Sequence, residues 1–145
     1  MSTKTKAIID ATFAGVSAKD LDAAVALMAD DIVLFDPHYP YPEMTGLAEV
    51  REGLTWGFGG MKTMGFDIDR YFFSEDGLSA AIEVSTHHVL STGKHLDFPQ
   101  AFYIDTNGEK ITRMRAYEPY PPGGMVGFGL GIGHRIYRLT HRRKR

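Results

Sequence analysis

The segment LFDPHYPYPEMTG, residues 34–46, holds the side chains of this sequence best suited to acid–base chemistry. An apolar run, IVLF, stops at Asp36, and His38, Tyr39 and Tyr41 follow among three prolines. A carboxylate at the end of a buried strand can act as a general base when it faces an apolar pocket. It can equally form a turn, because an Asp side chain accepts from the backbone N–H two residues on. On spacing alone, both interpretations of Asp36 stay open.

Three other polar side chains fall on strand positions that are expected to face inward. Strand alternation places His88 on the face of its apolar neighbours, Gln100 on the apolar face of HLDFPQAFYI, and Glu118 at the end of the last strand. His88 is either a proton shuttle or a hydrogen-bonded core histidine. Glu118 is a second acid or base, or a rim residue paired with Arg113 or Arg115, and the rim is favoured. Gln100 can also simply bond a neighbouring strand.

Aromatic and apolar side chains near these positions are candidates for the wall of a substrate pocket, although aromatic residues by default belong to a core. The expected substrate-binding residues are His38, Tyr39, Tyr41, Trp56, Phe98, Phe102, Met114 and Ala116.

The same residues argue against other chemistries. His87 and His88 are adjacent on a strand, point to opposite faces and cannot chelate one ion together, so no metal site is expected. The chain has no cysteine and no Gly-x-Ser-x-Gly motif, which excludes the common forms of nucleophilic catalysis. The alternating glycines of residues 127–133 do not match Gly-x-Gly-x-x-Gly, so no dinucleotide site is expected. We therefore expect no cofactor.

The elements that must position these side chains are helices first and strands second. Helical spacing over residues 2–16 is followed by a capping-box pattern, Ser17 to Asp20, which predicts a helix over residues 19–29. Residues 30–36 read as a strand. A third helix begins at Thr45 or Gly46, buries Leu47, Val50, Leu54 and Trp56, and ends at the glycines 57, 59 and 60.

Four strands are expected to follow, over residues 62–74, 78–90, 94–105 and 110–118, separated by glycine-containing turns. Helices followed by consecutive strands indicate an α+β fold with the helices on one face of a curved sheet. At 145 residues with 43% apolar residues, the chain is long enough for one domain with a real core. It has no signal peptide pattern and no apolar run near the roughly 18 residues of a membrane span, so a soluble, cytoplasmic protein is expected.

The charge is divided unevenly along the chain. The net charge is −2, but residues 119–145 hold six of the sixteen basic residues and none of the eighteen acidic ones, which leaves −8 on residues 1–118. The tail permits a short basic amphipathic helix around Arg135 and Arg138. It could dock on the acidic body of its own or a partner subunit, cover the pocket, or touch an anionic membrane or nucleic acid; the last few residues read as a flexible end.

The phrases DLDAAVALMADDIVLFDP, MTGLAEVREGL and TGKHLDFPQAFYIDTNGEKITRMRAYE together resemble the nuclear-transport-factor-two-like superfamily, over about residues 5–118. That superfamily includes ketosteroid isomerase, SnoaL-like polyketide cyclases, limonene epoxide hydrolase and scytalone dehydratase. The resemblance implies a cone-shaped curved antiparallel sheet around an apolar pocket, with three N-terminal helices. It implies a domain over residues 1–118, a Gly-rich then basic extension over 119–145, and a homodimer.

The resemblance also implies roles. Asp36 stands where isomerase-like members place their general base, and Gln100 where ketosteroid isomerase has the protonated aspartate of its oxyanion hole. The first-helix tyrosine of that enzyme has no match, because Thr12 and Phe13 occupy its region. The Asp-Arg-Asp arrangement of limonene epoxide hydrolase has no match either. His88, Glu118, Tyr39 and Asp36 fit the style of SnoaL-like cyclases and dehydratases.

The expected function is that of a cofactor-independent cyclase, isomerase or dehydratase acting on a small hydrophobic carbonyl compound. Asp36 would abstract a proton, Gln100 and Tyr39 would steady the enolate, and His88 or Glu118 would return the proton. The first alternative is a non-catalytic small-ligand-binding or protein-interaction module of the same fold, and the second a scaffold recruited through the basic tail. No nucleic acid partner is expected.

Overall fold

The computed structural model of the protein describes residues 2–118 and, beyond them, residues 128, 132, 135 and 139. The expected domain boundary at residue 118 and the Gly-rich, basic extension over 119–145 therefore lie outside the continuous described part. No helix within the described residues is long and apolar enough to cross a membrane.

Three helices precede or interrupt the first strands, as expected: α1 (Ser2–Ser17), α2 (Leu21–Val25) and α3 (Leu47–Gly60). Helix α1 buries one stripe, which consists of Thr5, Ile8, Ile9, Thr12 and Phe13. Helix α3 buries Val50, Leu54 and Phe58, whereas Trp56, which was grouped with the buried residues of this helix, is 57% exposed.

The helix expected over residues 19–29 is wrong in both its cap and its length. Ser17 ends α1, and the cap of α2 is Asp20, whose side chain accepts from the backbone N–H of Ala23 at 3.0 Å. The chain leaves the helix after Val25, because the backbone carbonyl of Leu27 accepts from the N–H of Ile111 at 2.7 Å. Strand pairing with the far end of the domain thus overrides the helical pattern of the segment.

The strands are β1 (Met28–Phe35), β2 (Glu43–Thr45), β3 (Met61–Phe73), β4 (Ser79–Leu90), β5 (His95–Thr106) and β6 (Ile111–Tyr117). They form one sheet in the order β2-β1-β6-β5-β4-β3. The last four strands agree with the expected ranges, whereas the short β2 was not predicted. All pairings are antiparallel except β1 with β6, which is parallel, so the sheet is mixed rather than purely antiparallel.

The faces of the strands follow the predicted alternation. On β4 the buried side chains are Ile82, Val84, Thr86 and His88, while Glu83 and His87 are exposed. On β5 and β6 the buried positions include Gln100, Phe102, Ile104, Met114 and Ala116. Polar Gln100 and His88 therefore lie on the same inner face as the core.

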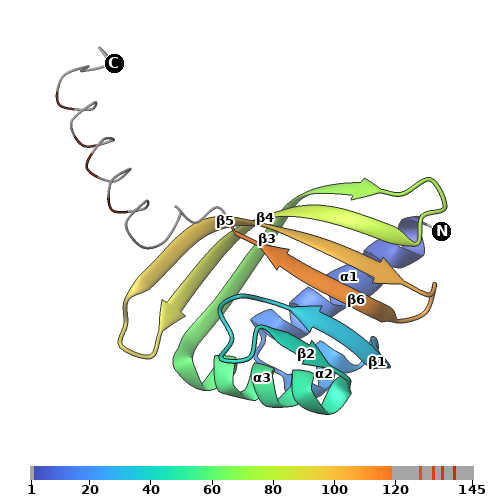
Figure 1. The fold of residues 1–145 in the computed structure, drawn as a ribbon, viewed down its shortest axis with the longest axis horizontal. Helices are drawn as coiled ribbons and strands as arrows, with labels where there is room; N and C mark the ends of the chain where they lie inside the picture. The colour runs from blue at the N-terminus through green and yellow to red at the C-terminus, as the bar shows by residue number, and fades with distance from the viewer. Residues whose placement is uncertain (1, 119–127, 129–131, 133–134, 136–138, 140–145) are drawn as a thin grey trace.

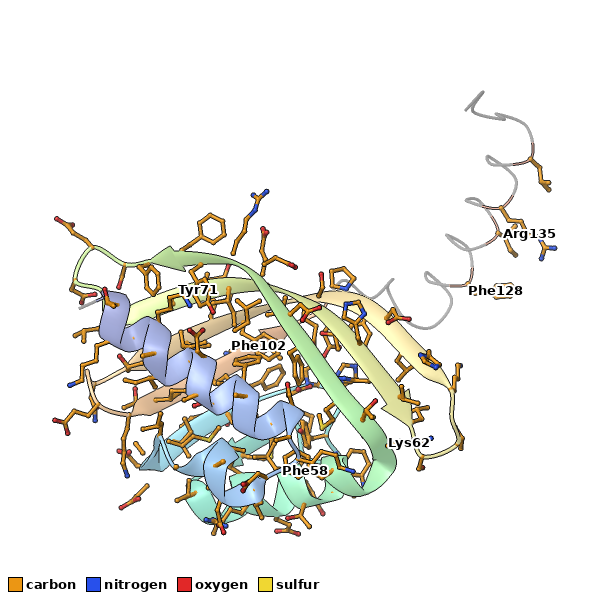
Figure 2. All side chains as sticks on the ribbon, turned by 180° about the vertical axis from the view of Figure 1, so that it is seen from behind. Phe58, Lys62, Tyr71, Phe102, Phe128 and Arg135 are labelled. Carbon is orange, nitrogen blue, oxygen red and sulfur yellow. The ribbon has the colours of Figure 1, made fainter. Side chains whose placement is uncertain are left out.

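The helices cover one face of the curved sheet. Figure 1 shows α1 crossing behind the strands, with α2 and α3 beside β1 and β2. Figure 2, from the opposite side, shows α1 lying over the sheet. Phe13 of α1 packs edge-on against Phe66 of β3 and Phe102 of β5, with ring centroids 5.3 and 5.1 Å apart. This contact joins the helical layer to the sheet. The expected α+β fold with a curved sheet is confirmed.

Candidate active site

A cavity of about 350 Å³ lies between the inner face of the sheet, α1, α3 and the loop that follows β1. Its wall is mostly apolar, and all but one of the expected substrate-binding residues line it. The exception is Tyr41, whose expected place in the pocket is wrong. It lies in the loop between β1 and β2 with 79% of its surface exposed, because the prolines on either side keep this segment at the surface.

Asp36 follows β1 directly. It both stabilises a turn and faces a cavity, the two alternatives that its sequence context left open. Its Oδ1 accepts from the backbone N–H of His38 at 2.9 Å, and its own N–H donates to the carbonyl of Pro42 at 2.9 Å, so it does stabilise a turn. The same side chain is 15% exposed and lines the cavity. The turn therefore holds the carboxylate at the cavity wall rather than in open solvent.

His38 connects Asp36 to Glu118. Its Nδ1 lies 3.2 Å from Oδ1 of Asp36 and also contacts Oε1 of Glu118. The side chain of Glu118 is only 1% exposed, so the expected rim position is wrong. Arg113 instead lies 3.5 Å from Asp105, and Arg115 lies over the ring of Phe35. Strand alternation directs both arginine side chains away from the inner face of the sheet. Glu118 lies on the inner face and therefore pairs with His38 of the loop instead.

Gln100 is held at both ends of its amide. Its Oε1 accepts from the hydroxyl of Thr86 at 2.7 Å, and its Nε2 donates to Oε1 of Glu118 at 2.6 Å. Together with the contacts of His38, these hydrogen bonds connect a series of polar side chains, which runs from Thr86 through Gln100, Glu118 and His38 to Asp36. The contact with Glu118 uses one of the two N–H bonds of the amide. Gln100 therefore orients Glu118, in addition to facing the cavity.

Two protonation states follow from this arrangement. The hydrogen bond to Asp36 and the charges of Asp36 and Glu118 raise the pKa of His38, against the opposing effect of burial. Burial, with the charge of Asp36, raises the pKa of Tyr39 far above its ordinary value. His38 thus holds its second ring proton to a higher pH than an ordinary histidine, and Tyr39 retains its hydroxyl proton as a donor.

The two adjacent histidines of β4 are separated by the sheet. His87 is exposed and lies 2.8 Å from Asp97 and 3.6 Å from Asp67, with a pKa raised chiefly by the hydrogen bond to Asp97. His88 is 6% exposed and lines the cavity, and its Nδ1 accepts from the backbone N–H of Gly65 at 3.3 Å. Only His88 therefore belongs to the site.

Asp36, His38 and Glu118 also form a cluster with the composition of a metal site, since their ligand atoms lie within 4.8 Å of one another. This cluster was not predicted from the sequence, because Glu118 comes from the other end of the domain. A divalent cation bound there would require the neutral form of His38, because Nδ1 would have to offer its lone pair.

One polar residue of the cavity was not predicted. Thr12 of α1 is 1% exposed and lines the cavity, and its hydroxyl has no hydrogen-bond partner among the residues that the structure describes. A helical Thr commonly bonds a carbonyl one turn earlier, so its sequence position carries no signal of a binding role. A buried hydroxyl without a partner costs free energy that a ligand oxygen could recover.

The profile of the SnoaL-like domain matches residues 9–114. The chain belongs to the SnoaL-like family. The match spans α1 through most of β6 and thus includes every element that lines the cavity. No curated protein matches the chain.

Solved structures share the fold of this SnoaL-like protein. The Δ5-3-ketosteroid isomerase from a Mycobacterium species superimposes with a TM-score of 0.69 at 20% identity, covering 79% of this chain and 92% of the other. A Mycobacterium tuberculosis protein in complex with estradiol-17β-hemisuccinate gives the same values. A candidate polyketide cyclase from Pseudomonas putida gives 0.67 at 20% identity, covering 76% and 87%. At these identities the likeness concerns the fold.

Proposed function

We propose that this SnoaL-like protein is a cofactor-independent acid–base enzyme, a cyclase, isomerase or dehydratase that acts on a small hydrophobic carbonyl compound. The observation that carries the proposal is the place of Asp36, which faces an apolar cavity of about 350 Å³ beside a His38–Glu118 pair. A cavity of this size with a few convergent polar groups is typical of small-molecule sites.

In the proposed reaction, Asp36 removes a proton from the carbon next to the substrate carbonyl, and negative charge develops on the oxygen. The hydroxyl of Tyr39 and the remaining N–H of Gln100 are candidate donors to that oxygen. Of the two residues expected to return the proton, Glu118 is the better placed, because its Oε1 contacts Nδ1 of His38, which can supply a proton.

Small-molecule binding without catalysis is the second candidate function. The turn that Asp36 stabilises favours this candidate, because a role in the turn explains the position of the carboxylate without any catalytic role. A related fold holds estradiol-17β-hemisuccinate, and we propose that this cavity likewise accepts a compact apolar molecule with polar ends. The two candidates share the binding step and differ only in the need for a base.

Asp36→Asn separates them. Asn keeps an oxygen that can accept from the N–H of His38 but cannot take a proton, so we expect kcat on polyketide-like and enone substrates to fall by about 100- to 10,000-fold. Ligand affinity should change little. Asp30→Asn, at an exposed position of the preceding strand β1, is the matched control. Equal activity of wild type and Asp36→Asn would remove Asp36 as the base and favour the binding module.

We also propose that the chain forms a homodimer and that its basic tail contacts the acidic body of its own or a partner subunit. The charge division supports the second point: −8 on residues 1–118 against six basic residues in 119–145.

A further inference from the structure

His88 lies in the apolar part of the cavity wall and is held by two aromatic rings. Its ring packs edge-on against Phe66, with centroids 4.8 Å apart and an interplanar angle of 83°. Phe98 lies 6.0 Å away at 90°. Because both neighbours are apolar and the side chain is 6% exposed, the two ring nitrogens have defined directions.

The hydrogen-bond partner of Nδ1 is the basis on which we assign the tautomer. Nδ1 accepts from the backbone N–H of Gly65 on the neighbouring strand, at 3.3 Å. A nitrogen that accepts carries no hydrogen, so the neutral ring carries its hydrogen on Nε2, on the other side of the ring. In the described part of the chain, Nε2 makes no hydrogen bond. The cavity wall therefore includes an N–H donor that is not used within the domain.

The surroundings of His88 favour the neutral ring. Burial is the largest cause that lowers its pKa, and the charges of His38 and His87 act in the same direction. A backbone hydrogen bond with His87 acts in the opposite direction, and so does the charge of Asp36. A neutral imidazole whose hydrogen lies on Nε2 would become an imidazolate if it gave that hydrogen away. His88 is therefore poorly suited to return a proton, one of its two expected roles.

We propose that His88 donates its Nε2–H to the substrate oxygen and does not itself exchange protons with the substrate. This inference rests on the proposed function, in which Asp36 takes the proton of the α-carbon. The C–H electron pair then forms the new C=C bond, the C=O pair moves to the oxygen, and the oxygen accepts from Nε2. The substrate class that fits is an enolisable carbonyl compound whose oxygen lies near Phe66 and Phe98.

The tautomer can be measured on the full-length protein without any substrate. Nitrogen-15 NMR of labelled histidine side chains, with the His88 signals identified by their loss in His88→Gln, should show Nε2 protonated and Nδ1 bare. The midpoint of the His88 titration should lie below 6.5, the ordinary value of a histidine. A neutral ring protonated on Nδ1, or a midpoint above 6.5, would overturn the proposal.

Binding tests the donor itself, with 2-naphthol as a mimic of an enolate oxygen and naphthalene as the probe without oxygen. His88→Gln keeps an N–H near the position of Nε2, whereas His88→Leu removes it. We expect 2-naphthol to bind about tenfold more weakly to His88→Leu and within about threefold of wild type to His88→Gln. Naphthalene should bind all three forms alike.

Equal affinity of 2-naphthol for wild type and His88→Leu, or no saturable binding to wild type, would overturn the donor role. Neither measurement needs turnover. If wild type and Asp36→Asn were equally active, the proposed function would be contradicted. The NMR and binding results on His88 would not change. Thermal unfolding shows whether the Leu variant is folded, and the NMR measurement on wild type does not depend on that variant.

Discussion

At the scale of single residues, this site is defined by which partner each polar side chain finds. Asp36 and Gln100 were expected to act directly on a ligand, yet each also holds a neighbour: Asp36 bonds the turn at His38, and Gln100 bonds Glu118. The polar groups thus form one connected series at an otherwise apolar wall. Such a series holds its members in a single geometry because each buried polar atom needs its partner.

The raised pKa of His38 predicts a pH-dependent contribution to stability. Its folded pKa lies above the ordinary value of 6.5, so the ion pair stabilises the fold fully below pH 6.5, while the carboxylates remain charged. This contribution is lost as the pH rises through the folded pKa. Replacing His38 with Asn, which keeps a donor near Nδ1, should therefore destabilise the protein most near pH 6 and progressively less at higher pH.

Urea unfolding followed at several pH values, with the free energies of wild type and His38→Asn subtracted, measures this effect. His95→Asn, at the exposed start of β5, serves as the control. A difference that grows with pH instead would mean that His38 is stabilised in its neutral form.

At the scale of elements, the site depends on how closely β3 approaches β4. Gly65 lies opposite His87 in this pair, and its N–H donates to His88. A Cβ added to Gly65 would lie 2.6 Å from the carbonyl oxygen of His87, a distance that real side chains do not tolerate. The two strands can therefore present His88 with this tautomer only while residue 65 is glycine.

Gly65→Ala is expected to destabilise the fold by about 1–3 kcal/mol, because the strands must separate to admit the methyl group. Gly59→Ala in α3 is the matched control, since nothing lies within 4 Å of its added Cβ. There the helix should gain about 0.5–1 kcal/mol from reduced backbone freedom in the unfolded chain. Chemical denaturation of the two variants measures both changes. Similar effects of the two substitutions would contradict the close approach.

At the scale of the whole molecule, the cavity exists because β6, the last described strand, pairs with β1, the first strand. The parallel pairing of β1 with β6 brings the loop at Asp36 beside the end of the last described strand, where Glu118 lies. Helices α1 and α3 then close the space over the inner face of the sheet (Figure 1). Catalytic candidates from distant parts of the sequence meet at this junction.

The proposed contact between the tail and the acidic body should depend on salt. Removing residues 123–145 is expected to lower the midpoint of thermal unfolding at low salt, and to lower it less in 0.5 M salt, where the Debye length is roughly 4–5 Å. Replacing Arg142, Arg143, Lys144 and Arg145 with Gln should reproduce part of the change. Equal shifts at both salt concentrations would contradict the contact, and the native mass of the truncated chain shows whether it joins two subunits.

The sequence predicted the order of the elements apart from the short β2, and the inward faces of β4, β5 and β6. Both follow from local rules, because alternation and turn residues act over a few positions. It therefore placed His88 and Gln100 inward and Asp36 at the end of a strand. It failed at residues 19–29, where the pairing of Met28 with Ile111 ends the helix.

Only the tertiary structure decided which polar groups meet. Three features depend on residues that are far apart in the chain: the burial of Glu118 against His38, the contact of Gly65 with Nδ1 of His88, and the hydroxyl of Thr12, which has no partner among the described residues. The parallel pairing of β1 with β6 was not predicted from the sequence either, because strand pairing depends on the path of the whole chain. The physical reason is common to all of these features: local propensity sets what an element is, while packing sets what it touches.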